Sequence, residues 1–357
     1  MKKSQKFDYI YIAKGLAMLA VVWGHTMLSG ETNYLVYGFD IPLFFFLSGM
    51  VFKREKYPYF NDFFKNRVKR LLVPYLIFSL VSWFEWVLYN LSEETTIIEC
   101  VKPLLQTFIA QGSSDFMDHN LPLWFVPCLF VIEMLYYLIS KAHSVINIVL
   151  CTGFAVLGYF MIQPDNIIDF TLMPWSMEGA FRALIFYSLG NNFVKLCGLE
   201  GIPNFIRSKK IIAILVWAVF TGLFIWGALY NGHVSIGSNI TGKNNLVFYG
   251  TAIAGIASTM IFSSAVENLI KKRKLPLSSY IKWVGLNSFY FMSIHMPVQK
   301  YVMPLAENIL AAVGYELTTE SYYDFNASLI TWAFMMIITS LIIAVINALR
   351  KAGSKSV

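Results

Sequence analysis

Apolar residues recur along the whole chain in runs of roughly 18–22, each long enough to cross the ~30 Å hydrocarbon core of a membrane as a helix. The pattern predicts ten spans, at 9–28, 36–52, 71–91, 121–140, 145–162, 177–194, 211–230, 246–266, 280–296 and 325–349. The stretch 96–110 is interpreted as a helix at the membrane surface. No fixed-period repeat or low-complexity tract divides the chain. We therefore expect an all-α, polytopic membrane protein with a single domain over residues 1–357.

Composition and charge agree with this class. Apolar residues make up 57% of the chain and charged residues only 14%, against roughly 25% in soluble domains. If the N-terminus is cytoplasmic, 23 of the 28 Lys and Arg residues fall on the cytoplasmic side, and only Lys102, Lys243 and Lys300 fall outside. This bias and the even number of spans place both termini in the cytoplasm. The net charge of +7 is thus a topology signal and gives no reason to expect a nucleic-acid partner.

The N-terminal segment resembles a secretory signal, since lysines precede an apolar stretch. Lys14 interrupts that stretch, however, and no small-residue cleavage site follows it. The segment is therefore interpreted as a retained first span, which makes the chain an integral, multi-pass protein of the plasma (inner) membrane.

Neither the four cysteines nor the five histidines show the spacing of a metal site, and the cysteines give no disulfide framework. No metal is expected. His25 and His295 lie within predicted spans, where an imidazole needs polar partners or a wet cavity. His233 and His143 are interpreted as ordinary polar residues of extramembrane segments.

The first span carries the most informative pair. Lys14 lies eleven residues before His25, which is about three helical turns, so the two side chains share one face and lie roughly 16 Å apart along the axis. Ionisable groups within a span are costly and are functional candidates by default. The pair indicates a polar path through the membrane.

The second span begins with Asp40 and contains Ser48 and Gly49. The short loop before it closes a hairpin that would bring Asp40 towards His25, where a carboxylate could fix the imidazole tautomer. Ser48 and Gly49 are small enough to admit a neighbouring helix or a thin ligand.

A basic motif precedes the third span. Arg67 and Arg70 are three residues apart on a predicted helix, so they share a face, and Pro74 follows. Two guanidinium groups on one face can bind a polyphosphate. Contact with lipid headgroups is the alternative interpretation.

Five motifs occur in the order found in the acyltransferase 3 superfamily, and the chain resembles its sugar O-acetylase-like branch. They are the first span from Phe7 to His25, Pro42 to Gly49, Arg67-x-x-Arg70 with Pro74-Tyr75, Leu123 to Pro127 around Trp124, and Gly285 to His295. Two positions depart from the pattern: Lys14 stands where the superfamily usually has Arg, and Asp40 where this branch often has His.

The resemblance implies an O-acyltransferase. Acyl-CoA, expected to be acetyl-CoA, would be the cytoplasmic donor, and a hydroxyl of an extracytoplasmic glycan or glycolipid the acceptor. Arg67 and Arg70 would bind the donor phosphates, and the pantetheine arm would enter past Ser48 and Gly49. His25 would act as general base or would itself accept the acyl group.

The other implied site residues fall into two sets. Lys14 and Asp40 would join His25 in the catalytic site. The substrate-binding set is Trp124, His119, Asn287 and His295, and the oxyanion donor would be Asn287, Ser288 or Lys14.

A competing class is a proton-coupled transporter or flippase of a small polar or lipid-linked substrate, in which His25, Lys14 and Arg182 would form the path. The Arg67-x-x-Arg70 motif favours the acyltransferase, because a transporter has no need to bind a nucleotide.

The charge bias gives a first prediction. Reporter domains fused after residue 3 and after residue 355 should both report the cytoplasm, because the lysines and arginines segregate to that side. Reporters on opposite sides of the membrane would contradict the even number of spans.

Overall fold

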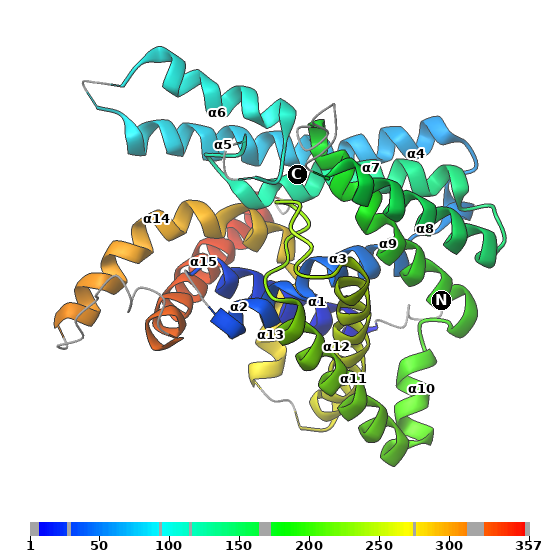
Figure 1. Ribbon diagram of the computed structural model, residues 1–357. Helices are drawn as coiled ribbons and strands as arrows, with labels where there is room; N and C mark the ends of the chain where they lie inside the picture. The colour runs from blue at the N-terminus through cyan, green and yellow to red at the C-terminus, as the bar shows by residue number, and fades with distance from the viewer. Residues whose placement is uncertain are drawn as a thin grey trace.

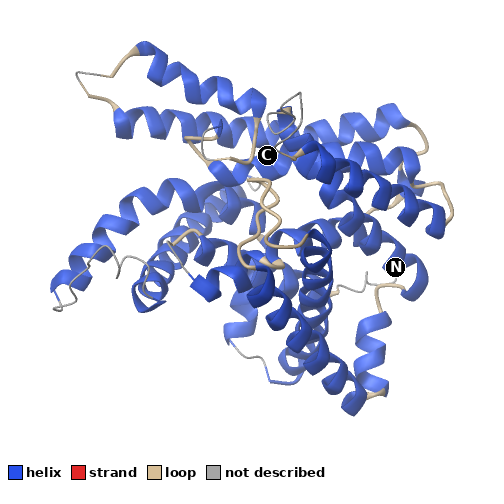
Figure 2. Ribbon diagram, viewed as in Figure 1, coloured by secondary structure: helices blue, strands red, loops and turns tan. Residues whose placement is uncertain are grey.

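The structure is a computed structural model that describes residues 7–26, 30–92, 95–113, 116–163, 173–273, 276–312 and 325–353. Lysines 2, 3, 6, 274 and 355, which the topology argument used, lie outside these residues. Within them the regular structure is helical (Figure 2), and the single β-bridge joins Ser235 to Ile240. The predicted all-α class is confirmed.

Fifteen α-helices follow one another in the described part of the chain (Figure 1). They are α1 Asp8–Gly24, α2 Gly30–Tyr37, α3 Asp40–Met50, α4 Phe60–Arg67, α5 Val73–Asn90, α6 Ile97–Ile109, α7 Phe125–Ile139, α8 Ser144–Met161, α9 Met177–Cys197, α10 Gly201–Ser208, α11 Lys210–Asn231, α12 Asn245–Arg273, α13 Pro276–Leu286, α14 Ser288–Ala312 and α15 Phe325–Gly353. A π-helical turn, Val68–Leu72, joins α4 to α5.

Six helical stretches in the described residues are long and apolar enough to cross a membrane. They are Phe60–Asn90, Leu121–Ile139, Ser144–Met161, Lys210–Asn231, Asn245–Glu267 and Phe325–Gly353. The other four predicted spans fall on α1 and α3, which are short, on α9, and on the junction of α13 and α14. The chain is thus a multi-pass membrane protein, while the count of ten spans and the sidedness stay predictions.

Two predicted spans are not single helices. The 36–52 segment is broken after Tyr37, and the 280–296 segment is broken at Asn287. At this point the Trp283 carbonyl accepts from both the backbone amide and the side chain of Asn287, at 3.1 and 2.9 Å. The prediction of continuous helices is wrong at both places, because apolar runs do not report local breaks.

Helix α1 lies at the centre of the bundle (Figure 1). It packs on α13, α12 and α3, and its ends also contact α14 and α15. Trp332 donates to the Leu19 carbonyl at 3.0 Å, and Lys282 pairs with Asp8 at 2.6 Å. Protein therefore surrounds α1, and its polar face borders protein rather than lipid.

Paired glycines allow the closest helix crossings. A Cβ on Gly15 would overlap the Ile281 carbonyl, and one on Gly285 would overlap the Tyr11 carbonyl, where α1 crosses α13. The α3–α9 crossing is built in the same way from Gly49 and Gly190. Small residues let helix backbones touch within membranes. Gly49 therefore admits a neighbouring helix, and its role beside a ligand stays a prediction.

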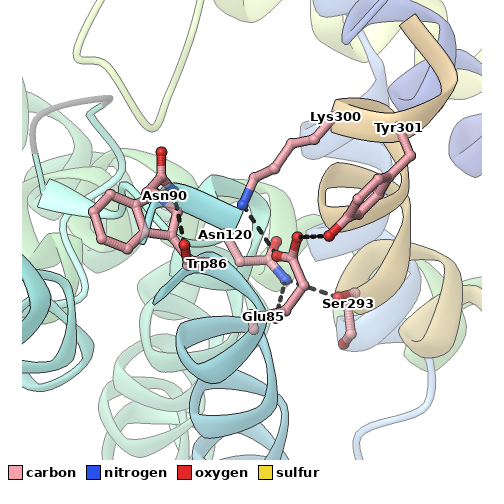
Figure 3. Close-up of polar contacts among 8 residues, drawn as sticks. Glu85, Trp86, Asn90, Asn120, Ser293, Lys300 and Tyr301 are labelled. Carbon is pink, nitrogen blue, oxygen red and sulfur yellow. Dashed lines mark hydrogen bonds and ion pairs between the residues drawn. The ribbon is translucent and has the colours of Figure 1, made fainter. Parts of the chain in front are cut away.

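A polar cluster joins the α5–α6 hairpin to α14 (Figure 3). Glu85 accepts bonds from Lys300 at 3.0 Å and from Tyr301 at 2.9 Å. Asn120 donates to the Ser293 carbonyl at 2.7 Å. These contacts hold α14 in place behind the cavity described below.

The α3–α9 crossing yields a stability prediction. Gly49→Ala should lower the thermal stability of the detergent-solubilised protein, because the added methyl group meets the Tyr187 carbonyl and overpacking costs about 1–3 kcal/mol. Gly153→Ala is the matched control, since its Cβ would meet no atom within 4 Å. Equal melting temperatures for the two variants would contradict the crossing.

Candidate functional site

A cavity of about 340 Å³ lies between α1, α3, the start of α7, α14 and the loop 232–244. Lys14 and Ser48 line one part of it, and His25, Tyr37 and His233 line another. Aromatic and aliphatic side chains form most of the remaining wall, among them Met18, Phe44, Leu121, Trp124, Phe125 and Met292. The cavity thus includes both ends of the polar face predicted on α1.

His25 is the C-cap of α1 and is half-buried. Its Nδ1 lies 2.7 Å from the Val21 carbonyl oxygen. A carbonyl only accepts, so Nδ1 carries the proton and Nε2 keeps its lone pair. The Gln299 side chain donates to the His25 backbone carbonyl and fixes this helix end. The ring is therefore held in the tautomer that a general base at Nε2 requires.

His295 packs against His25 from α14. The ring centroids are 5.0 Å apart in an edge-to-face arrangement, and His295 is fully buried. Its Nδ1 lies 2.7 Å from the Phe291 carbonyl, while its Nε2 has no hydrogen-bond partner among the described residues. His295 does not line the cavity itself but supports the His25 ring.

Tyr37, which the sequence analysis did not name, lies between His25 and His233 in the cavity wall. The Tyr37 ring centroid is 6.4 Å from that of His25 and 5.2 Å from that of His233. His233 donates from Nδ1 to Asn33 Oδ1 at 2.7 Å, and burial lowers the pKa of His233. His233 has the polar partner expected of an ordinary loop residue, but its loop also brings it to the cavity wall, which the sequence did not predict.

Asp40 is buried and lines the same cavity. Its Oδ1 accepts from the Ile41 amide at 2.6 Å, and no hydrogen bond joins it to His25 within the described residues. The expectation that Asp40 fixes the His25 tautomer is corrected, since the Val21 carbonyl does so. Asp40 stays a candidate through its position in the cavity wall.

Lys14 and Ser48 border the cavity from α1 and α3. Lys14 is half-buried, and in the described part of the chain no carboxylate pairs with it. Ser48 donates to the Phe44 carbonyl at 2.8 Å. An ammonium group without a protein counterion in a cavity wall is suited to an anionic or carbonyl group of a ligand.

The predicted substrate-binding residues are separated by the fold. Trp124 lines the cavity. His119 is instead buried between Ser79 and Thr107, with Nε2 3.2 and 3.4 Å from their hydroxyls. Burial lowers the pKa of His119 to about 4. Asn287 accepts from Asn347 at 2.9 Å and ties α15 to the α13–α14 junction, although the adjacent Ser288 does line the cavity.

Arg67 and Arg70 lie in different surroundings. Arg67 Nε lies 2.8 Å from Glu133 Oε2 on α7, and the guanidinium lies 4.9 Å from the Phe63 ring centroid. Arg70 is exposed. The π-helical turn has more residues per turn than an α-helix, so residues three apart diverge. Arg70 nevertheless directly precedes Leu71, which lines the cavity.

Arg182, a member of the alternative transport path, is fully buried on α9 and donates to Asn239 at 3.2 Å. It is not part of the cavity wall. Among the described residues, no group of three His, Cys, Asp or Glu side chains is placed to hold a metal ion.

Fold and cavity together define a multi-pass helical protein with an oriented imidazole at a largely apolar cavity that also contains polar groups. A family model described as an acyltransferase domain, that of the acyltransferase 3 superfamily, matches residues 7–348. The chain therefore belongs to this superfamily and is a membrane acyltransferase. No curated protein and no solved structure matches the chain.

The Arg67–Glu133 pair yields a prediction. Arg67→Ala should destabilise the protein, because Glu133 would be left buried and unpaired. Breaking a fully buried pair costs about 3–5 kcal/mol, and the loss is smaller here because Arg67 keeps 17% side-chain exposure. Thermal unfolding in detergent measures the loss. Arg67→Ala with Glu133→Leu should recover part of it, and Arg70→Ala should be neutral. An Arg67→Ala variant as stable as the parent would contradict this assignment.

Proposed function

We propose that the protein is an O-acetyltransferase of the plasma membrane that moves an acetyl group from cytoplasmic acetyl-CoA to a hydroxyl of an extracytoplasmic glycan or glycolipid. One observation carries the proposal. The unprotonated Nε2 of His25 belongs to a ring on the wall of a cavity that also contains Lys14, about three helical turns further along α1. Two substrates approaching from opposite sides could meet in such a cavity.

The chemistry follows from the His25 tautomer. The acceptor hydroxyl oxygen attacks the thioester carbonyl carbon while Nε2 takes the hydroxyl proton, and the C–S bond then breaks. The departing thiolate receives that proton as CoA leaves. A second route, in which Nε2 first accepts the acyl group, uses the same atom. Ser288 and Lys14 both line the cavity and are candidate donors to the oxyanion.

The donor is proposed to bind at the Lys14 end. Arg70 is exposed beside the cavity-lining Leu71, and the ion pair of Arg67 with Glu133 engages Nε, which leaves its terminal nitrogens for phosphate oxygens. The narrow pantetheine arm would then pass Lys14 and Ser48 towards His25.

The alternative, a proton-coupled transporter or flippase, has less support. Its path needed His25, Lys14 and Arg182, and Arg182 lies apart from the cavity with its bond to the loop residue Asn239. No observation favours transport over transfer.

The direct test uses purified protein in detergent with acetyl-CoA. CoA release should depend on an added glycan or glycolipid extract, and mass spectrometry should find the acetyl group on that acceptor. Absence of CoA release and of acetylated product with every extract would contradict the proposal.

The role of His25 can be tested separately. His25→Ala should reduce acetyl transfer about 10²–10⁴-fold, the usual contribution of a positioned general base. His143→Ala is the matched control, since His143 is an exposed histidine outside the cavity. If the His25→Ala variant retained more than about a tenth of the parent rate, neither role of His25 would hold.

A further inference from the structure

The loop 232–244, which links α11 and α12, turns back across the middle of the bundle (Figures 1 and 2). His233, Ser235, Gly237 and Ser238 from this loop line the cavity, together with Tyr37. The loop lies at the His25 end of the cavity, since the Tyr37 ring contacts the rings of both His25 and His233.

Internal hydrogen bonds give the loop one shape. Ser235 and Ile240 exchange backbone bonds of 2.8 Å in both directions. At its base, the Asn231 side chain donates to the Thr241 carbonyl at 2.9 Å and accepts from the Asn244 amide at 2.7 Å. Hydrogen bonds within the turn and at the base of the loop give it a defined structure, so it can present its side chains to a ligand.

Two buried charged residues hold the tip of the loop. Asn239 has a φ of +59°, in the left-handed region, and accepts a bond from Arg182 at 3.2 Å. It donates to Glu178 at 3.1 Å. Both charged residues are fully buried on α9. Burying them is costly, and their bonds to Asn239 fix the position of the loop.

Close packing sets the width of the cavity at this point. A Cβ on Gly237 would come within 2.7 Å of the Trp124 ring, so the loop backbone lies directly on the indole. Ser238 donates to the Gly112 carbonyl at 3.4 Å. Small side chains in the loop leave space for a ligand beside Trp124 and Tyr37.

The groups at this end of the cavity are the Asp40 carboxyl, neutral hydrogen-bonding groups and aromatic rings. His233 donates through Nδ1 to Asn33, so its Nε2 is an acceptor, and Ser235 and Ser238 offer hydroxyls. Lys14 is the one Lys or Arg residue in the described cavity wall, and it lies about 16 Å from His25 along α1. Uncharged sugars are recognised by hydroxyl-bonding groups beside aromatic faces, whereas anionic sugars need a cation.

We propose that the loop 232–244 and Tyr37 form the acceptor subsite and that this subsite takes an uncharged hexose unit. The proposal rests on the transferase function proposed above. It assigns substrate selection to residues distinct from His25 and from the donor-binding arginines.

The test on the parent protein compares matched neutral and acidic acceptors at saturating acetyl-CoA. The probes are the 4-nitrophenyl glycosides of glucose, galactose and mannose, and the 4-nitrophenyl glycosides of glucuronic and galacturonic acid. At least one neutral glycoside should be acetylated with a kcat/KM tenfold or more above that of every uronide. Uronides used equally well, or acetylation of a glycan extract without acetylation of any neutral glycoside, would overturn the proposal.

Variants of the loop give an independent test. Ser235→Ala with Ser238→Ala, and separately Asn239→Gly, should raise the KM for the neutral glycoside about tenfold and leave the KM for acetyl-CoA within twofold. Asn239→Gly keeps the left-handed backbone accessible while removing the bonds to Glu178 and Arg182. Ser208→Ala is the matched control, because Ser208 is exposed on α10 and bonds within its own helix.

The outcomes separate the two proposals. A parent protein that releases no CoA with any acceptor contradicts the transferase function itself. A parent protein that is active, with loop variants whose KM for the glycoside equals that of Ser208→Ala, overturns only the subsite.

Discussion

The crossing of α1 and α13 at Gly15 and Gly285 is the contact on which the site depends. Each glycine lies against a carbonyl of the other helix, so no side chain separates the two backbones. This closeness lets protein enclose α1, and enclosure allows Lys14 and His25 to face a cavity instead of lipid. Ionisable groups in a span are otherwise costly, so the helix packing and the candidate chemistry have the same origin.

The sequence was sufficient for the helical class and for the position of most helices, because apolar runs of membrane length are a strong signal. It was insufficient for breaks within those runs. At Asn287 the backbone amide is shared between the Trp283 and Val284 carbonyls, and the π-helical turn Val68–Leu72 separates Arg67 from Arg70. Both are local hydrogen-bonding choices that hydropathy does not record.

The site was predictable where residues share one helix. The three-turn spacing of Lys14 and His25 follows from helix geometry alone. Contacts between distant segments were not predictable in this way. Asn287 and its neighbour Ser288 face different surroundings, and His233 comes to the cavity only because Asn239 anchors its loop to α9. The sequence of a polar loop rich in Asn, Gly and Ser does not predict that the loop folds back onto the cavity.

The Gly49–Gly190 crossing has a consequence for the size of the acyl group. Helix α3 supplies Phe44 and Ser48 to the cavity wall, and its other side lies directly on the backbone of α9. The backbone of α3 therefore cannot move outward, because main chain already meets main chain behind it. Each added methylene of an acyl chain in this cavity would therefore have to displace another part of the lining. Under the proposed function, the fixed position of the α3 backbone would be one limit on the length of the acyl group.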